Sequence, residues 1–260
     1  MDSYPEPTIN EQNLFGLYRE MGRTRYVRYA CERGVEWAYS DRVVWPKGVF
    51  LAQRPGTEPA ALVAEVTEHM LAGRMPRVWI TSPASRAELL DPVLLREGFV
   101  AHPALPAMLL EPAAYRAPDV FCPELSIREV SERPDLEQWA CVARNDDAGA
   151  QPTLDFGDMW SQACCARPAD FRFFVGALAG EDAGVVALYT AENVAGLYWV
   201  ATRPAFRGRG VGTAVTRRAV EEAFAAGARR CVLHATEMGV RIYRRLGFRE
   251  LFSYGVFRLP

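Results

Sequence analysis

Hydrophobic residues follow one another at Trp199, Val200 and Ala201, and beyond Pro204 the hydrophobic spacing changes. The uninterrupted run predicts the end of a buried strand, which Pro204 stops because proline has no N–H. The later residues recur with the spacing of one helix face: Val211, Val215, Ala219 and Ala223. The pattern therefore predicts a strand, a loop at 207–212 and a helix.

The same criteria predict alternating helices and strands along the whole chain. In the first part they give helices at 14–21, 60–71 and 87–96 and strands at 43–52 and 78–81. In the second part they give strands at 125–130, 171–179, 185–190, 194–201, 230–234 and 252–258, and further helices at 134–144, 156–166 and 239–246. The order in the second part is β-α-α-β-β-β-α-β-α-β.

Two short segments resemble each other: LLREGF, which ends at Phe99, and YRRLGF, which ends at Phe248. Each precedes a strand-like segment, which favours two copies of one architecture, although a helix that ends in glycine is common in any fold. Prolines at 112, 118 and 123 indicate a stiff connection. We expect a domain at 1–112, a linker at 113–123 and a second domain at 124–260, which agrees with a length above the usual size of one domain.

The loop at 207–212 has the composition of an anion site. Gly208, Gly210 and Gly212 let backbone N–H groups approach a ligand, and the helix that follows adds unpaired donors. Arg207 and Arg209 add guanidinium groups that suit phosphate oxygens. The spacing fits neither a P-loop nor a dinucleotide fingerprint, and a pyrophosphate is the expected ligand.

Arg207, Gly210 and Gly212 form the pattern R-x-x-G-x-G, and MGVRIYRRLGF follows at 238–248. Together the two motifs resemble the GNAT superfamily of acetyl-CoA-dependent N-acetyltransferases. The resemblance implies an α+β (α/β) fold with a mixed, mostly antiparallel sheet flanked by helices. The first copy is expected to be degenerate, because its strand 78–81 leads into Thr81-Ser82-Pro83 and Leu94 stands where the second copy has Tyr243.

The resemblance also implies roles for individual residues. Tyr243 matches the tyrosine that donates a proton to the sulfur of coenzyme A, and an N–H near Val200 or Ala201 is expected to face the acetyl oxygen. Many members have an asparagine where this chain has Thr236. The expected coenzyme A-binding residues are Val200, Ala201, Thr202, Arg207, Gly208, Arg209, Gly210, Val211, Gly212, Thr213 and Thr236.

The base that takes the proton of the amine has no motif. Glu192, Glu237 and His234 are candidates, and each also has an ordinary structural interpretation. Asp146, Asp147 and Asp155 fall in the expected acceptor region, where helix capping is an equal explanation. Cys164 and Cys165 have no accompanying His and Asp arrangement, which argues against a cysteine nucleophile.

Composition argues against several functional classes of protein. The 260 residues have a formal net charge of −2, so global charge indicates neither nucleic-acid nor membrane binding. The arginines at 217, 218, 244 and 245 fit solvated helix faces and lack interleaved aromatic residues. Six cysteines and three histidines show no metal-ligand spacing, so no metal is expected. The polar N-terminus has no signal-peptide pattern, and we expect a cytoplasmic protein.

The sequence thus predicts an acyltransferase that moves an acetyl group from acetyl-CoA directly to a primary amine of a small molecule or peptide. One alternative is a non-catalytic acyl-CoA-binding sensor or interaction module, against which the retained Tyr243 argues. Another is an enzyme that uses a longer acyl-CoA. The acceptor and the oligomeric state stay open.

Overall fold

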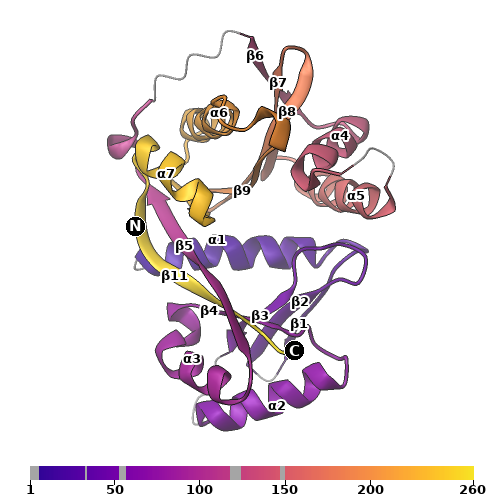
Figure 1. The fold of residues 1–260 in the computed structure, drawn as a ribbon, viewed down its shortest axis with the longest axis vertical. Helices are drawn as coiled ribbons and strands as arrows, with labels where there is room; N and C mark the ends of the chain where they lie inside the picture. Colours follow the sequence, from indigo (N-terminus) through magenta and orange to yellow (C-terminus); the bar gives the residue numbers. More distant parts are fainter. Residues whose placement is uncertain (1–5, 33, 53–56, 118–123, 147–149) are drawn as a thin grey trace. The chain divides into compact units, whose positions relative to one another are not determined.

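The computed structural model of the protein describes residues 6–32, 34–52, 57–117, 124–146 and 150–260. Packing divides the chain into two units (Figure 1). Unit 1 consists of Met1–Ala107 together with Glu250–Pro260, and unit 2 consists of Met108–Arg249.

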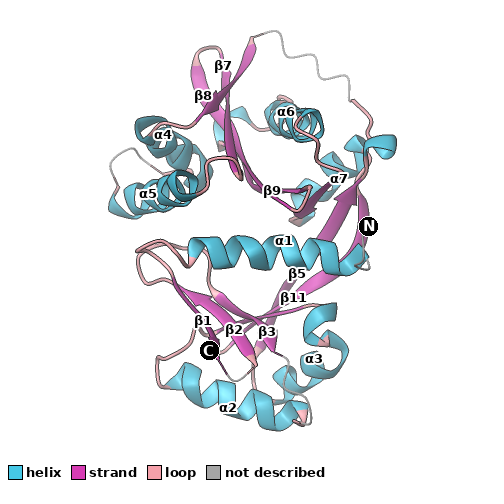
Figure 2. Ribbon diagram, turned by 180° about the vertical axis from the view of Figure 1, so that it is seen from behind, coloured by secondary structure: helices cyan, strands magenta, loops and turns pink. Residues whose placement is uncertain are grey.

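Unit 1 is a sheet with helices on both faces (Figure 2). Successive residues of one strand show the two layers, because side chains alternate across a strand. Val49 lies in the core beneath two helices, whereas the ring of Phe50 is 4.9 Å from the rings of Phe15 and Tyr18 on a third helix. The elements are α1 (Glu6–Met21), β1 (Arg28–Glu32), β2 (Val35–Tyr39), β3 (Gly48–Ala52), α2 (Pro59–Leu71), β4 (Val78–Thr81), α3 (Ala87–Arg96), β11 (Arg249–Arg258) and the first part of β5 (Val100–Leu110).

Unit 2 is also a layered α/β arrangement. The elements are β6 (Leu125–Val130), α4 (Arg133–Arg144), α5 (Gln151–Ala166), β7 (Phe171–Leu178), β8 (Glu181–Ala191), β9 (Val194–Thr202), α6 (Val211–Ala225), β10 (Arg230–His234) and α7 (Glu237–Leu246). The strands are ordered β10-β9-β8-β7-β6, and only the β10–β9 pair is parallel. Phe174 joins the core beneath α6 and α7, whereas the ring of Phe173 is 5.4 Å from Trp139 on the α4 and α5 face.

Unit 1 is discontinuous in sequence, because its last strand comes from the C-terminal part of the chain. After α3 the chain passes through β5, and Met108 and Leu110 at its end lie in the core of unit 2. After α7 the chain continues into β11, which pairs antiparallel with β4 and places Phe257 and Leu259 in the core of unit 1. These units therefore differ from the domain limits expected from the sequence, which stay predictions, and part of the expected linker lies outside the described residues.

The helices α3 and α7 end in the same way. Gly98 and Gly247 have positive φ angles of 87° and 100°, as a glycine after a helix often has. Phe99 N donates to the carbonyl of Leu94, and Phe248 N donates to the carbonyl of Tyr243, both at 3.0 Å. Leu94 is therefore the counterpart of Tyr243, as the sequence predicted.

One part of the predicted correspondence between the copies was wrong. β3 and β4 pair in parallel, as β9 and β10 do, so β4 is the counterpart of β10 and not of β9. The counterpart of the glycine-rich loop is consequently 53–58, between β3 and α2, rather than Thr81-Ser82-Pro83. Residues 53–56 lie outside the described part. The error arose because the hairpin formed by β1 and β2 was not predicted.

Most other elements agree with the sequence prediction. β4, α3, β6 and β10 have the predicted bounds. The strand predicted from Val43 begins only at Gly48, and the helix predicted from Phe156 begins at Gln151 with a proline in its first turn.

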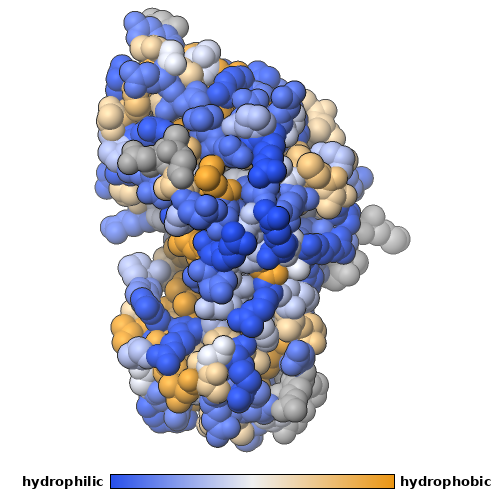
Figure 3. Space-filling view, turned by 90° about the vertical axis from the view of Figure 1, so that its right-hand side faces the viewer, coloured by the Kyte–Doolittle hydropathy of each residue, from blue (hydrophilic) through white to orange (hydrophobic). Residues whose placement is uncertain are grey.

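Hydrophilic residues cover most of the face seen in Figure 3, with hydrophobic residues scattered among them, as is normal for a protein surface. Within the described residues, no helix has both the length and the apolar character that a membrane crossing requires.

Candidate active site

The strands β9 and β10 separate part-way along their length. Their parallel pairing runs from Arg230↔Val194 to Val232↔Gly196, yet β9 continues to Thr202. On its other side β9 remains paired with β8 up to Gly184↔Thr202. The second half of β9 therefore has backbone groups on one side that β10 does not pair.

A β-bulge lies within the part of β9 that β10 does not pair. Tyr198 pairs with Ala187 and Ala201 pairs with Val185, so Trp199 and Val200 together face Val186. Trp199 has a φ of 52°, and its ring contacts Phe156 at 4.7 Å between centroids. A bulge bends a strand and redirects its side chains. Here it leaves Val200 on the wall of a cavity.

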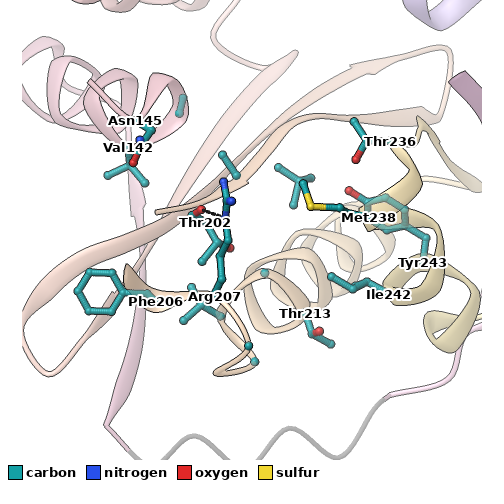
Figure 4. A pocket seen from close by; sticks show the side chains of 18 of the residues that line it. Val142, Asn145, Thr202, Phe206, Arg207, Thr213, Thr236, Met238, Ile242 and Tyr243 are labelled. Carbon is teal, nitrogen blue, oxygen red and sulfur yellow. Dashed lines mark hydrogen bonds between the residues drawn. The ribbon is translucent and has the colours of Figure 1, made fainter. Parts of the chain in front are cut away.

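The glycine-rich loop connects β9 to α6. Gly208 and Gly210 have φ angles of 74° and 83°. Residues other than Gly, Asn and Asp rarely adopt a positive φ of this size. A Cβ on Gly212 would lie 3.1 Å from Oγ1 of Thr202, so the close approach of the helix to β9 also favours glycine. The Nε of Arg207 donates to the carbonyl of Thr202 at 3.2 Å, which directs this side chain over the end of β9 (Figure 4).

The first turn of α6 offers further donors. The first bond of the helix runs from Ala214 N to the carbonyl of Gly210 at 3.0 Å. The N–H groups of Val211, Gly212 and Thr213 consequently have no acceptor within the helix. All three residues line the same cavity, and the positive end of the helix dipole lies there.

Tyr243 reaches the cavity from α7. Only 7% of the residue is exposed, its ring lies 5.9 Å from that of Phe248, and no residue in the described part hydrogen-bonds its hydroxyl. Burial raises the pKa of Tyr243 above its ordinary value, so the phenol keeps its proton at neutral pH. A Cβ at Gly239 would lie 2.8 Å from the tyrosine ring, so this glycine leaves space for the phenol.

The cavity has a volume of about 580 Å³ and lies entirely within unit 2. It brings together ten of the eleven coenzyme A-binding residues expected from the sequence, together with Tyr243. The exception is Arg209, whose guanidinium lies 5.7 Å from the ring centre of Phe206. Sequence reasoning missed eight further lining residues: Val142, Ala143, Asn145, Phe206, Met238, Gly239, Ile242 and Arg245.

The candidate bases lie elsewhere. Glu192 is in the turn between β8 and β9, at the opposite end of β9 from Val200, and Glu237 is exposed and does not line the cavity. His234 does not line it either; burial lowers its pKa to about 4, and its ring centre is 5.6 Å from that of Tyr198.

The acidic residues of α4, α5 and their connection make local contacts. Asp146 pairs with Arg144 at 2.9 Å, and Asp155 accepts a hydrogen bond from Gln151 at 2.8 Å. Asp147 lies outside the described residues. The carboxylates of Asp146 and Asp155 thus fit a local structural role better than a role in binding the acceptor amine.

The structure gives no support to a cysteine nucleophile, a metal site or a nucleic-acid-binding surface in the described residues. Burial raises the pKa of the Cys164 thiol, which lowers its reactivity. The described residues contain no group of three or more His, Cys, Asp or Glu that could hold a metal ion. Arg217 and Arg218 pair with Glu221 and Glu222 one turn along α6, as solvated helix faces do.

Residues 133–248 match the model of the acetyltransferase (GNAT) family. This part of the chain is a GNAT-family domain. The match covers both motifs, the split strands and the whole of the described cavity lining. The domain is therefore an acetyltransferase, which is one kind of acyltransferase. No curated protein matches the sequence.

Solved structures resemble nearly the whole chain. A GCN5-related N-acetyltransferase from Kribbella flavida has a TM-score of 0.68 at 20% identity, with 95% of each chain covered. One from Sphaerobacter thermophilus has a TM-score of 0.62 at 14% identity, covering 97% of this chain and 90% of the other. A tandem GNAT protein from the clavulanic acid biosynthesis pathway has a TM-score of 0.60 at 14% identity, covering 86% and 78%. The predicted GNAT fold with tandem halves is confirmed.

Proposed function

We propose that unit 2 transfers an acetyl group from acetyl-CoA directly to a primary amine. The observation that carries this proposal is that one cavity joins three features. They are the glycine-rich loop with the start of α6, the half of β9 that β10 does not pair and the buried phenol of Tyr243.

The cavity lining fits a ligand that carries phosphates. Gly208 leaves open space, and the first turn of α6 presents unpaired N–H groups. Arg207 and Arg245 are the charged residues among the described lining, and no carboxylate is among them. We assign the diphosphate of coenzyme A to the loop 208–212, with Arg207 beside it.

The half of β9 that β10 does not pair suits the pantetheine arm. The amide groups of this arm can pair with an exposed strand as an added strand would. An N–H at Val200 or Ala201, next to the bulge, is the donor that we assign to the acetyl oxygen. Acetyl-CoA supplies a thioester whose carbonyl carbon forms a C–N bond with the amine as its C–S bond breaks.

Tyr243 protonates the sulfur that leaves. Because burial raises its pKa, the phenol is in the acid form at neutral pH and can donate that proton. The amine nitrogen loses one proton, and one proton returns to Tyr243, so the products are the amide and free coenzyme A. No carboxylate or imidazole lines the cavity in the described ranges, and we assign the removal of the amine proton to water.

Calorimetric titration with acetyl-CoA and with coenzyme A tests the cofactor site. Gly210→Asp places a negative charge in the loop, whereas Gly180→Asp places the same charge at a turn residue with nearly the same φ, 84°, away from the cavity. We expect Gly180→Asp to bind like wild type and Gly210→Asp to bind about 100-fold more weakly, because like charges in contact cost several kcal/mol. Equal affinities in both variants would refute the site.

Turnover is tested separately by measuring free thiol with a panel of primary amines. Release of thiol that depends on the amine supports the transferase. Tight binding of acetyl-CoA without amine-dependent release would instead favour the non-catalytic acyl-CoA-binding module.

A further inference from the structure

Arg245 is a lining residue that the proposed chemistry does not use. It stands two residues after Tyr243 on α7 and reaches the same cavity as the loop 208–212. The diphosphate already has donors in Arg207 and the first turn of α6. These groups lie on the loop and α6 side of the cavity, whereas Arg245 comes from α7. A second guanidinium on the α7 wall therefore needs a different explanation.

The position of Arg245 follows from the periodicity of α7. Ile242 lies one turn earlier on the same face, and its Cδ1 would be 3.9 Å from a Cβ on Gly212 at the start of α6. Ile242 of α7 and Thr213 of α6 both line the cavity (Figure 4). Arg245 thus continues, by one turn, the side of α7 that faces the start of α6.

The charge environment of Arg245 favours an anionic ligand. Within the described part of the chain Arg245 has no ion pair, whereas Arg217 and Arg218 on α6 each pair with a glutamate. The described lining has no carboxylate that could neutralise it. A guanidinium on a cavity wall without a carboxylate is suited to phosphate oxygens.

We propose that Arg245 binds the 3′-phosphate of coenzyme A and makes unit 2 selective for the 3′-phosphorylated cofactor. This inference rests on the proposed function. The 3′-phosphate sits on the ribose, separate from the diphosphate, and a phosphate monoester carries nearly two negative charges at pH 7. Arg207 is already assigned to the diphosphate, and Arg209 packs on Phe206 outside the cavity lining, so the 3′-phosphate is assigned to Arg245. Acyl donors without the 3′-phosphate are expected to bind more weakly.

Titration with coenzyme A and with 3′-dephospho-coenzyme A tests the proposal. We expect wild type to prefer coenzyme A about tenfold, as one charge-assisted contact near solvent allows. Arg245→Gln should reduce this preference to near unity by weakening the binding of coenzyme A, with the affinity for the dephospho form unchanged. Arg241→Gln, on the same helix but outside the cavity lining, should keep the wild-type preference.

The outcomes separate this inference from the proposed function. If Arg245→Gln weakens the binding of both ligands equally, or leaves the preference for coenzyme A intact, Arg245 does not bind the 3′-phosphate. The inference then fails while the proposed function stands. If wild type binds neither ligand, both fail. In support of an ionic contact, the preference of wild type should also shrink at high salt, whereas the residual preference of Arg245→Gln should not.

Discussion

Replacing Tyr243 by phenylalanine removes the proposed proton donor and little else. The hydroxyl has no hydrogen-bond partner in the described part of the chain, and the ring keeps its contacts with Phe248 and the core. The free energy of unfolding should therefore change by less than about 1 kcal/mol. Since no partner is left unsatisfied, a large loss of stability would itself contradict the described geometry.

The effect on turnover should be much larger. A positioned general acid contributes about 10² to 10⁴ in rate, which corresponds to about 3 to 5 kcal/mol of transition-state stabilisation. The hydroxyl acts on the leaving sulfur, so kcat should fall by this factor while the Kd for acetyl-CoA stays within about twofold. The assay is thiol release at saturating amine, with Kd from calorimetry.

Tyr115→Phe is the matched control. Tyr115 lies outside the cavity, and its hydroxyl donates to Glu221 at 2.8 Å. The same chemical change there should leave kcat intact and cost about 1 kcal/mol of stability for the lost hydrogen bond. An unchanged kcat in Tyr243→Phe, or an equal loss of acetyl-CoA affinity and kcat, would refute the role of Tyr243 as the acid.

The pH profile gives an independent check of the same role. A general acid stops working when pH rises through its pKa, and burial raises the pKa of Tyr243. For the wild type we therefore expect kcat to show no fall from deprotonation of Tyr243 up to pH 10. A descending limb centred below pH 9 that disappears in Tyr243→Phe would contradict the described burial.

Two further predictions concern stability. Gly247→Ala should cost about 3 kcal/mol or more of stability, because φ is 100° and the new Cβ would overlap the carbonyl oxygen of Ala114. Gly98→Ala, with φ at 87° and no atom within 4 Å of the new Cβ, should cost only about 1 kcal/mol for the strained backbone. Equal losses of the two variants in thermal denaturation would contradict the close packing after α7. His234 has a pKa of about 4 in the folded protein and 6.5 when unfolded, so the unfolded state binds more protons in this interval. Stability should fall as pH drops from 6.5 to 4, by at most about 3 kcal/mol from this group, and His234→Gln should remove that part of the slope in denaturant titrations at several pH values; the same slope in the variant would show that His234 is not desolvated.

The parts of the site that could be predicted are those formed by residues close together in the sequence. Glycines at positive φ, a proline that ends a strand and a helix that begins beyond them lie within a dozen residues, so their spacing already specifies the loop. Tyr243 could be predicted because MGVRIYRRLGF resembles the GNAT motif, and the helix end at Gly247 and Phe248 is itself a local pattern. Local spacing could not show which arginine faces the cavity: Arg207 bends back to the carbonyl of Thr202, whereas Arg209 packs on Phe206.

The parts that could not be predicted depend on contacts between distant segments. Val142 and Asn145 line the cavity only because α4 packs against β8 and β9, and nothing in the α4 sequence marks that neighbour. The hairpin of β1 and β2 has short strands, and missing it shifted the correspondence between the two copies by one strand. The periodicity of the sequence could not show that β11 belongs to unit 1, because a strand shows the same alternation in either sheet.

The first residues of unit 2 bear directly on how the proposed acid, Tyr243, is held in place. Met108 and Leu110 belong to the core that contains Tyr243, and they precede the linker that the sequence predicts. The next residues also hold the end of α7, since Arg116 N donates to the carbonyl of Leu246 at 3.0 Å. A Cβ on Gly247 would meet the carbonyl of Ala114, so this segment fits closely against the helix end. The helix that positions the phenol is therefore packed by residues 108–116, and we propose that the catalytic domain begins at Met108 rather than at Glu124.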